Sequence, residues 1–356
     1  MTGSPANRTL RGMSDDHVFL KACRREPVPY TPIWLMRQAG RYQPSYMEIR
    51  SKVSFVELCK TPELACQVTV DAVEQLGVDA AILFADILLI LEPLGVGFHF
   101  AKGEGPKIEN PLRSAADIDR VAEEIDAAAE LSYVMESVKA IRKELDGKTP
   151  LIGFAGAPFT LASYAIEGGG SRDYHHTKKI MYGDEGAWNT LMDRFSRAIT
   201  GYLIAQIDAG AQAVQLFDSW VGCLSEADYR RYVLPHVKGI FEALGDRVPC
   251  IHFGQGNPAL YPALREAGGH VMSVDWRLPL SEAWDRVGRD VGIQGNLDPV
   301  SVLAPREVMF ERTKAVLDEV KGQEGHVFNL GHGILRWSEV DQVRALVDYV
   351  HEQSAR

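Results

Sequence analysis

Short apolar runs recur along the chain, and each ends on a polar residue or a glycine. An amphipathic stretch with helical spacing follows before the next run begins. Because both faces of the runs are apolar and no hairpin turn joins neighbouring runs, the pattern predicts buried parallel strands. There are eight such runs, at Ile33–Met36, Ala80–Ala85, Leu151–Ala155, Ala213–Phe217, Pro249–Phe253, Val271–Val274, Gly292–Gln294 and His326–Leu330.

The segments between the runs carry signals for helix starts and ends. Thr61-Pro62 favours a helix start, and this helix is expected to end near Gly77. Ser225 and Asp228 have the spacing of a capping box, with Asp in place of the usual Glu, and open a helix towards Gly245. Further helices are expected to begin at Ser281, Pro305 and Ser338, and residues 114–147 are long enough for two more.

Eight strands that alternate with helices predict a single-domain α/β fold, a closed (β/α)8 TIM barrel. An open, doubly wound sheet is the alternative that the same alternation allows. No linker or change in composition divides the chain, so we expect one catalytic domain over residues 18–356. Residues 1–17 form a polar N-terminal segment whose composition is compatible with disorder.

The charge balance narrows the choice of partners. The chain of 356 residues has 38 basic and 48 acidic side chains, a formal net charge of -10. This argues against nucleic acid or an anionic membrane as the main partner, whereas a local arginine cluster can still bind a small anion. The most apolar stretch, residues 76–91, is interrupted by Asp79 and Asp86, so we expect no membrane span.

The N-terminus and the cysteines bear on the cellular compartment. Residues 1–17 lack the apolar core of a secretory signal. The five cysteines are scattered, and no two have CxxC spacing. Both features are typical of a cytoplasmic protein with reduced thiols.

In a barrel of this kind, chemistry belongs to the residues that follow the C-terminal ends of the strands. Arg37 and Arg41 flank a glycine turn after the first run, and two guanidinium groups so placed favour the binding of carboxylates over a role in surface ion pairs. Asp86 follows the second run between apolar flanks. It can cap a helix, but a carboxylate in such surroundings is costly unless a donor meets it, which favours a functional role.

The other strand ends give weaker signals. Tyr164 can be a core aromatic residue, and Ser219 can cap the helix that follows it. His332 lies between two glycines, which would allow a close approach of backbone and ligand. His252 alone is better explained as structural, and Glu167–Ser171 is either a mobile lid or a loose loop.

Several types of catalytic group are missing from the predicted strand ends. No lysine stands there, which weakens Schiff-base chemistry, and no cluster of His, Cys and carboxylate has zinc spacing. His252-Phe253-Gly254 lacks the cysteine expected of a zinc-dependent methyltransferase of similar barrel type. We therefore expect a site that needs no metal or organic cofactor.

Six motifs in the chain resemble, in order, those of the uroporphyrinogen decarboxylase family. The resemblance extends from about residue 30 to the C-terminus. It implies a single-domain barrel that forms a homodimer with facing clefts, and a cofactor-free carboxy-lyase that converts uroporphyrinogen III to coproporphyrinogen III by removing four acetate carboxyl groups. The motifs are at residues 32–42, 84–88, 153–164, 217–220, 294–299 and 329–334.

The resemblance also assigns site residues. It implies that Asp86, Arg37, Tyr164 and His332 are catalytic, with the identity of the proton donors left open. Arg50 is a weaker candidate for a carboxylate contact, and the segments 254–257 and 335–338 depart from the family pattern. The implied substrate-binding residues are Arg37, Gln38, Ala39, Gly40, Arg41, Asp86, Tyr164, Ser219 and His332.

Two other functions remain as alternatives. One is a zinc-dependent methyltransferase of related barrel type, which the missing zinc ligands disfavour. The other is a tetrapyrrole-binding protein without catalysis.

Overall fold

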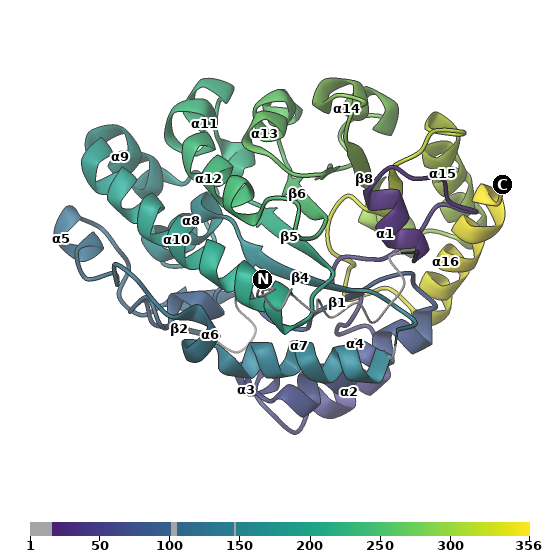
Figure 1. Cartoon of the computed structure of the whole chain (residues 1–356), viewed down its shortest axis with the longest axis horizontal. Helices are drawn as coiled ribbons and strands as arrows, with labels where there is room; N and C mark the ends of the chain where they lie inside the picture. Colours follow the sequence, from purple (N-terminus) through teal and green to yellow (C-terminus); the bar gives the residue numbers. More distant parts are fainter. Residues whose placement is uncertain (1–15, 101–104, 146) are drawn as a thin grey trace, which may run out of the picture.

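Parallel strands form one curled sheet, with helices arranged outside it (Figure 1). The computed structural model of the chain describes residues 16–100, 105–145 and 147–356. Strands that are consecutive in the sheet are paired in parallel, so every connection must cross over, as the barrel prediction requires. The sheet holds seven strands in the order β1 (Ala81–Ile82), β4 (Leu151–Gly156), β5 (Ala213–Asp218), β6 (Cys250–Gly254), β7 (Val271–Ser273), β8 (Gly292–Leu297) and β9 (His326–Leu330).

The first predicted strand, Ile33–Met36, is wrong as a strand. Only Ile33 makes a bridge, in parallel with Phe328 of β9. On the other side, the carbonyl of Ile33 accepts a hydrogen bond of 2.8 Å from the N–H of Asp79, just before β1. This short segment therefore fills the eighth position between β9 and β1. The strand stops early because the next backbone N–H groups bond to side chains, that of Leu35 to Gln38 and that of Met36 to Asn329.

The crossover between β1 and β4 contains elements that were not predicted. A two-stranded antiparallel sheet pairs β2 (Phe98–Phe100) with β3 (Pro106–Ile108). Residues 114–147, expected to form two helices, contain three: α5 (Ala115–Ile118), α6 (Ala127–Glu130) and α7 (Ser132–Leu145).

The remaining helices follow the predicted starts closely. Gly77 ends α4 in the left-handed conformation, with φ 71°, and the hydroxyl of Ser225 accepts a hydrogen bond from the N–H of Asp228. The helix expected to run to Gly245 is divided in two, because Pro235 lacks a donor for a continuous helix. The first and middle helices are α1 (Val18–Cys23), α2 (Pro44–Arg50), α3 (Phe55–Lys60), α4 (Pro62–Leu76), α8 (Pro158–Glu167), α9 (His175–Gly183) and α10 (Glu185–Ala209). The last are α11 (Glu226–Tyr232), α12 (Leu234–Leu244), α13 (Tyr261–Ala267), α14 (Leu280–Val287), α15 (Arg306–Glu319) and α16 (Val340–Ser354). Short 3₁₀ turns are η1 (Leu89–Leu91), η2 (Val221–Cys223), η3 (Pro258–Leu260) and η4 (Pro299–Leu303).

Two of the predicted helix starts are shifted slightly. The helix expected at Ser281 begins one residue earlier, and the one expected at Ser338 begins two residues later. The hydroxyl and N–H of Ser281 bond to Glu319 instead of capping their own helix. Pro305 does stand immediately before α15.

Side chains fill the interior of the barrel. The indole N–H of Trp34 donates to the Oε1 atom of Gln294 at 2.9 Å, and the Nε2 atom of Gln294 donates to Gln215 and Ser273. All four side chains are buried. Because the centre of the barrel is packed, ligands must bind at one end of it.

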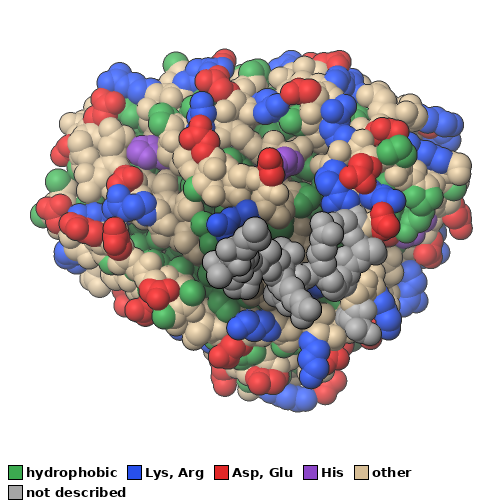
Figure 2. Space-filling model, in the orientation of Figure 1, with side chains coloured by type: hydrophobic (Ala, Val, Ile, Leu, Met, Phe, Trp, Pro, Cys, Tyr) green, Lys and Arg blue, Asp and Glu red, His purple; other side chains and the backbone are tan. Residues whose placement is uncertain are grey.

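The surface and the ends of the chain bear on the remaining predictions. On the face shown in Figure 2, acidic and basic side chains are intermixed over the outer helices. Among the described residues, no helix is both long and apolar enough to cross a membrane. Of the predicted N-terminal segment, residues 1–15 lie outside the described residues, and His17 caps α1.

Candidate active site

The loop after Ile33 is held in place by one buried side chain. Gln38 accepts a hydrogen bond of 3.1 Å from the N–H of Leu35 and donates one of 3.0 Å to the carbonyl of Ala80, just before β1. The hydroxyl of Tyr42 donates to the carbonyl of Gln38 at 2.6 Å. Gln38 was expected to bind substrate, but its side chain is used by the fold.

The two arginines of this loop are exposed. Arg37 adopts a left-handed conformation with φ 64°, and Ala39 and Gly40 are half-buried beside it. Within residues 16–100, 105–145 and 147–356, no hydrogen bond or ion pair engages the guanidinium of Arg37 or that of Arg41. The loop thus presents two cations that are free to bind an anion.

Asp86 follows β1 and is half-buried among apolar residues. Its Oδ1 atom accepts a hydrogen bond of 2.9 Å from the N–H of Leu88, as a capping residue would. Burial raises the pKa of Asp86, while this hydrogen bond and the nearby charge of Arg37 lower it. The capping role is confirmed, because one carboxylate oxygen stabilises the local turn. The other oxygen has no hydrogen bond among the described residues, and the functional role stays a prediction.

His332 is enclosed by glycines for a reason that differs from the prediction. A Cβ atom on Gly331 would lie 2.7 Å from the backbone nitrogen of Trp276, and one on Gly333 would lie 2.6 Å from the Cδ atom of Arg37. The glycines therefore make room for Trp276 and Arg37. The Nδ1 atom of His332 accepts a hydrogen bond from the N–H of Gly333, so the proton of a neutral ring is on Nε2. Burial, with the nearby Arg37, lowers the pKa of His332 to about 4.

Tyr164 lies on α8, half-buried, with its ring 5.8 Å from that of Trp220. Burial and the charge of Asp86 raise its pKa, whereas a hydrogen bond with Trp220 and the charge of Arg37 lower it. Arg37 therefore lies within electrostatic reach of Asp86, Tyr164 and His332, and Tyr164 lies within reach of Asp86. The four residues predicted to be catalytic come from four separate segments and are linked through Arg37.

The other predicted contacts are less central. Ser219 is half-buried after β5, and its carbonyl accepts a hydrogen bond of 3.2 Å from Gln255, in one of the segments that depart from the family pattern. Arg50 donates to the carbonyl of Val53 and lies 6.0 Å from the ring centre of Phe55. His252, expected to be structural, is buried and its Nδ1 atom lies 3.2 Å from the carbonyls of Leu264 and Gly268. No hydrogen bond or ion pair joins Ser219 or Arg50 directly to the four central residues within the described part of the chain.

Sequence reasoning missed a third cation near His332. Asp275 is fully buried after β7 and accepts hydrogen bonds from the N–H of Gly256 and from both the N–H and the guanidinium of Arg277. The guanidinium also stacks on Trp276, 4.6 Å from the ring centre. It lies close enough to His332 to lower the pKa of the imidazole. The Asp275-Trp276 strand end was visible in the sequence, but nothing there showed that Asp275 would orient an arginine.

A further buried acid stands at the end of β5. Asp218, the last residue of β5, has one carboxylate oxygen 3.1 Å from the hydroxyl of Thr160, and its other oxygen has no hydrogen-bond partner in the structure. Burial raises the pKa of Asp218 to about 8, so the carboxyl is mostly protonated at neutral pH.

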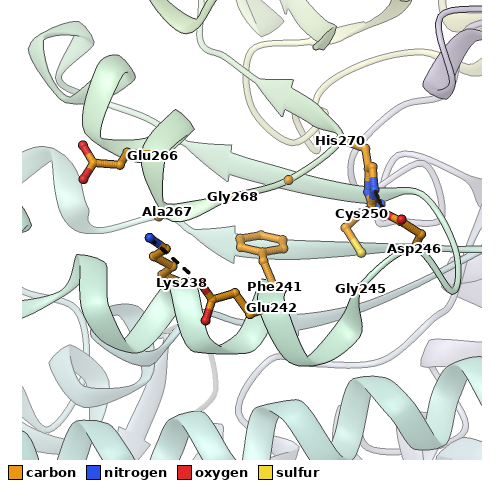
Figure 3. A pocket seen from close by; sticks show the side chains of 11 residues that line it. Lys238, Phe241, Glu242, Gly245, Asp246, Cys250, Glu266, Ala267, Gly268 and His270 are labelled. Atoms are coloured by element: carbon orange, nitrogen blue, oxygen red, sulfur yellow. Dashed lines mark hydrogen bonds and ion pairs between the residues drawn. The ribbon is translucent and has the colours of Figure 1, made fainter. Parts of the chain in front are cut away.

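A cavity of about 240 Å³ lies at the opposite edge of the sheet, where β6 begins (Figure 3). His270 in its wall is 3.1 Å from Asp246, and Lys238 is 3.9 Å from Glu242. Burial raises the pKa of the Cys250 thiol to about 12, so this cysteine is a poor nucleophile. The cavity therefore does not compete with the site at the C-terminal strand ends. All five cysteines of the chain are free thiols.

The fold brings together one set of potential metal ligands that is not apparent from sequence spacing. Among the described residues, Glu167, His175 and His176 offer ligand atoms within 4.8 Å of one another. They lie where α8 ends and α9 begins.

The fold and the site define a single-domain (β/α)8-barrel enzyme. Its C-terminal strand ends carry the half-buried carboxylate of Asp86 and two arginines, Arg37 and Arg41, that have no hydrogen-bond partner among the described residues. The family model described as "Uroporphyrinogen decarboxylase (URO-D)" matches residues 14–353. The chain therefore belongs to the uroporphyrinogen decarboxylase family, whose members are carboxy-lyases.

Individual relatives agree with this assignment. The chain is 57% identical over 336 residues to the uroporphyrinogen decarboxylase of Sorangium cellulosum, covering 94% of this chain and 95% of that protein. It is 55% identical over 338 residues to that of Carboxydothermus hydrogenoformans, covering 95% and 96%. Among solved structures, a methyltransferase from Methanosarcina mazei has a TM-score of 0.77 at 18% identity and covers 94% of this chain and 97% of that one, which shows a shared fold alone.

Proposed function

We propose that the chain removes the four acetate carboxyl groups of uroporphyrinogen III and releases coproporphyrinogen III and carbon dioxide. The observation that carries this proposal is that Arg37 lies within electrostatic reach of Asp86, Tyr164 and His332, with Asp86 as the anion of the group. The substrate is a reduced macrocycle with pyrrole N–H donors at its centre and carboxylates around its rim. A central acceptor and peripheral cations match both features.

The side chains that have no hydrogen-bond partner among the described residues indicate how the substrate would be bound. The Oδ2 atom of Asp86 has no partner among the described residues and can accept pyrrole N–H bonds, which offsets the cost of burying the carboxylate. Arg37 and Arg41 can hold rim carboxylates through charge-assisted hydrogen bonds. Arg277 adds a third cation on the His332 side, and Asp275 fixes its orientation. Gln38, Ala39 and Gly40 contribute through the shape and backbone of the loop, and Ser219 through the turn after β5.

Decarboxylation needs an electron sink, and the substrate supplies it. Protonation of a pyrrole carbon makes the ring cationic, and the electron pair of the bond to the departing carboxylate then moves into the ring. Carbon dioxide leaves and an exocyclic methylene remains. A second proton converts the methylene to a methyl group, and the ring returns its first proton, so each acetate consumes one proton overall. Asp86 stabilises the positive charge as it develops, which is where fixed electrostatics accelerate a reaction.

The structure narrows the choice of proton donor. His332, with a pKa of about 4, is neutral at pH 7, so its imidazole does not hold the extra proton that a general acid would donate. It can present Nε2–H as a hydrogen-bond donor. The raised pKa of Tyr164 likewise makes it a weak acid. We therefore propose that protons arrive through water held by Arg37, with His332 and Tyr164 orienting the substrate.

The test of the proposed function is an anaerobic assay with reduced uroporphyrinogen III, with products separated by chromatography. We expect successive intermediates with seven, six and five carboxyl groups and then coproporphyrinogen III, in a reaction that needs no added metal. A binding protein without catalysis would return the substrate unchanged. A zinc-dependent methyltransferase would instead lose its activity when treated with a chelator and would leave the carboxyl count of the porphyrinogen at eight.

We also propose that the chain acts as a cytoplasmic homodimer that binds no nucleic acid. Exposed apolar side chains follow β8 and β9: Trp337 is 64% exposed, Val300 59% and Leu303 41%. Arg336 stacks on Trp337 at 4.6 Å from the ring centre. Because these residues follow the C-terminal strand ends, a second copy covering them would face the site. Sedimentation velocity should show a dimer that Trp337→Glu dissociates, and a monomer at all working concentrations would overturn this proposal.

A further inference from the structure

Three side chains that commonly bind metal ions meet where α8 ends and α9 begins. Glu167 is the last residue of α8, and His175 and His176 are the first two of α9. One carboxylate oxygen and two imidazole nitrogens lie within 4.8 Å of one another. The imidazole rings are 3.9 Å apart between centroids and inclined by 41°. The loop between the helices therefore brings the three groups close together.

The ligand atoms are available and partly oriented. The Oε1 atom of Glu167 accepts hydrogen bonds from the N–H of Thr177 at 2.8 Å and from its hydroxyl at 2.9 Å, which fixes the carboxylate while Oε2 stays free. Such outer hydrogen bonds are typical of metal-binding carboxylates. Over residues 16–100, 105–145 and 147–356, no hydrogen bond or ion pair engages the ring nitrogens of His175 or His176.

Nearby cations act against metal binding. Arg113 and Lys179 are close enough to His176 to affect it electrostatically, and both repel a doubly charged ion.

The distances require a small adjustment. Metal–ligand bonds of about 2.0 to 2.2 Å place neighbouring ligand atoms roughly 3.4 Å apart in a tetrahedral site. A closure of about an ångström per side chain would be enough. His175 is exposed and His176 is half-buried, so rotation of the two imidazole side chains can achieve it while Thr177 holds the carboxylate of Glu167.

We propose that Glu167, His175 and His176 form a binding site for one divalent transition-metal ion such as Zn²⁺, with the fourth position open to water. Two imidazoles and a carboxylate suit Zn²⁺, Ni²⁺ and Cu²⁺ better than Mg²⁺ or Ca²⁺, which prefer oxygen ligands. The site shares no residue with the group formed by Asp86, Arg37, Tyr164 and His332, and Glu167 lies about one helical turn after Tyr164 on α8.

Calorimetric titration of the full chain with Zn²⁺ in a chelator-free buffer at about pH 7.5 tests the site. We expect one ion per chain. His176→Ala should weaken binding at least about tenfold, and Glu167→Gln should also weaken it. His99→Ala is the matched control, because His99 is an exposed histidine 4.0 Å from Glu109 and far along the chain from the cluster. Binding by His176→Ala that equals binding by the parent would overturn the proposal.

A spectroscopic readout separates ligation from a general loss of structure. Cu²⁺ bound to the parent chain should show electron paramagnetic resonance couplings to two nitrogens. A folded His175→Ala variant, checked by circular dichroism, should show one nitrogen fewer. A parent spectrum without two nitrogen couplings would exclude ligation by both histidines.

Discussion

At the scale of single residues, the candidate site depends on the carboxylate of Asp86, which has one hydrogen-bonded oxygen and one without a partner among the described residues. The Oδ1 atom of Asp86 is held by the N–H of Leu88, which fixes the direction of Oδ2. Burial opposes its charge and Arg37 favours it. A bound substrate would stabilise the ionised carboxylate of Asp86, first through its N–H donors and then through its developing positive charge. The carboxylate is already oriented, so, unlike water, it need not reorganise during the reaction.

Asp86→Asn should therefore remove most of the activity while it preserves the fold. Asparagine can still accept the hydrogen bond from Leu88, but it brings no charge and aims an N–H₂ group at the pyrrole donors. We expect kcat to fall about 10²- to 10³-fold. The anaerobic assay measures this, with thermal unfolding as the check on structure. Turnover within twofold of the parent would contradict the role given to Asp86.

Substitutions of the two exposed arginines, Arg37 and Arg41, should distinguish a role in substrate binding from a role in catalysis. Arg41 has no partner in the described part of the chain, so Arg41→Ala should raise KM about tenfold and leave kcat nearly unchanged, as expected for the loss of one charge-assisted contact. Arg37→Ala should affect both constants, because Arg37 is within electrostatic reach of Asp86 and His332. Arg247→Ala, which removes an exposed arginine 3.6 Å from Asp208, is the control. An unchanged KM in Arg41→Ala would rule out the carboxylate contact.

At the scale of elements, the sequence predicted the strands that are marked by an apolar run of their own residues. Seven of the eight apolar runs are strands, because buried parallel strands are apolar on both faces. The first run failed because Gln38 and Asn329 bond to its backbone, and these contacts bridge residues 3 and 293 positions apart. The β2–β3 pair was missed because strands of three residues are too short to show a periodic pattern.

The loop after Ile33 offers a test at this scale. Gln38→Ala leaves the N–H of Leu35 and the carbonyl of Ala80 without their partner, and each of these buried groups costs about 1–3 kcal/mol when unpaired. We expect a loss of stability in urea unfolding, together with a raised KM because Arg37 and Arg41 lose their support. Tyr42→Phe removes one hydrogen bond from the same loop and should have a smaller effect. If Gln38→Ala raised KM with no loss of stability, Gln38 would be a direct substrate contact.

At the scale of the whole molecule, the parallel order of the strands explains why part of the site was predictable. Arg37, Asp86, Tyr164 and His332 are far apart in sequence, but each follows a predicted strand, and the C-terminal ends of parallel strands meet at one edge. Arg277 was missed because its position depends on the buried Asp275, which the sequence does not reveal.

Buried titratable groups give the molecule a distinctive dependence of stability on pH. The pKa values of His252, His326 and His332 are lowered to about 4 by burial, whereas that of Asp218 is raised to about 8. Between pH 4 and about 6.5, the unfolded chain binds protons at the three histidines that the folded chain excludes, and the folded chain holds one extra at Asp218. The unfolded chain thus binds about two more protons, so the free energy of unfolding rises with pH in this window.

By about pH 7.5 the histidines are mostly neutral in the unfolded chain as well, and of these four groups only Asp218 still differs. There the folded chain binds the extra proton, so stability should fall by up to about 1.4 kcal/mol per pH unit until pH 8. Urea unfolding at fixed protein concentration from pH 5 to 8.5 should show a maximum between about pH 6.5 and 7.5. Asp218→Asn should abolish the decline on the alkaline side and keep the rise on the acid side, because it removes the carboxyl and leaves the histidines. A stability that is level across the range, or an alkaline decline that survives in Asp218→Asn, would mean that Asp218 is ionised in the folded chain.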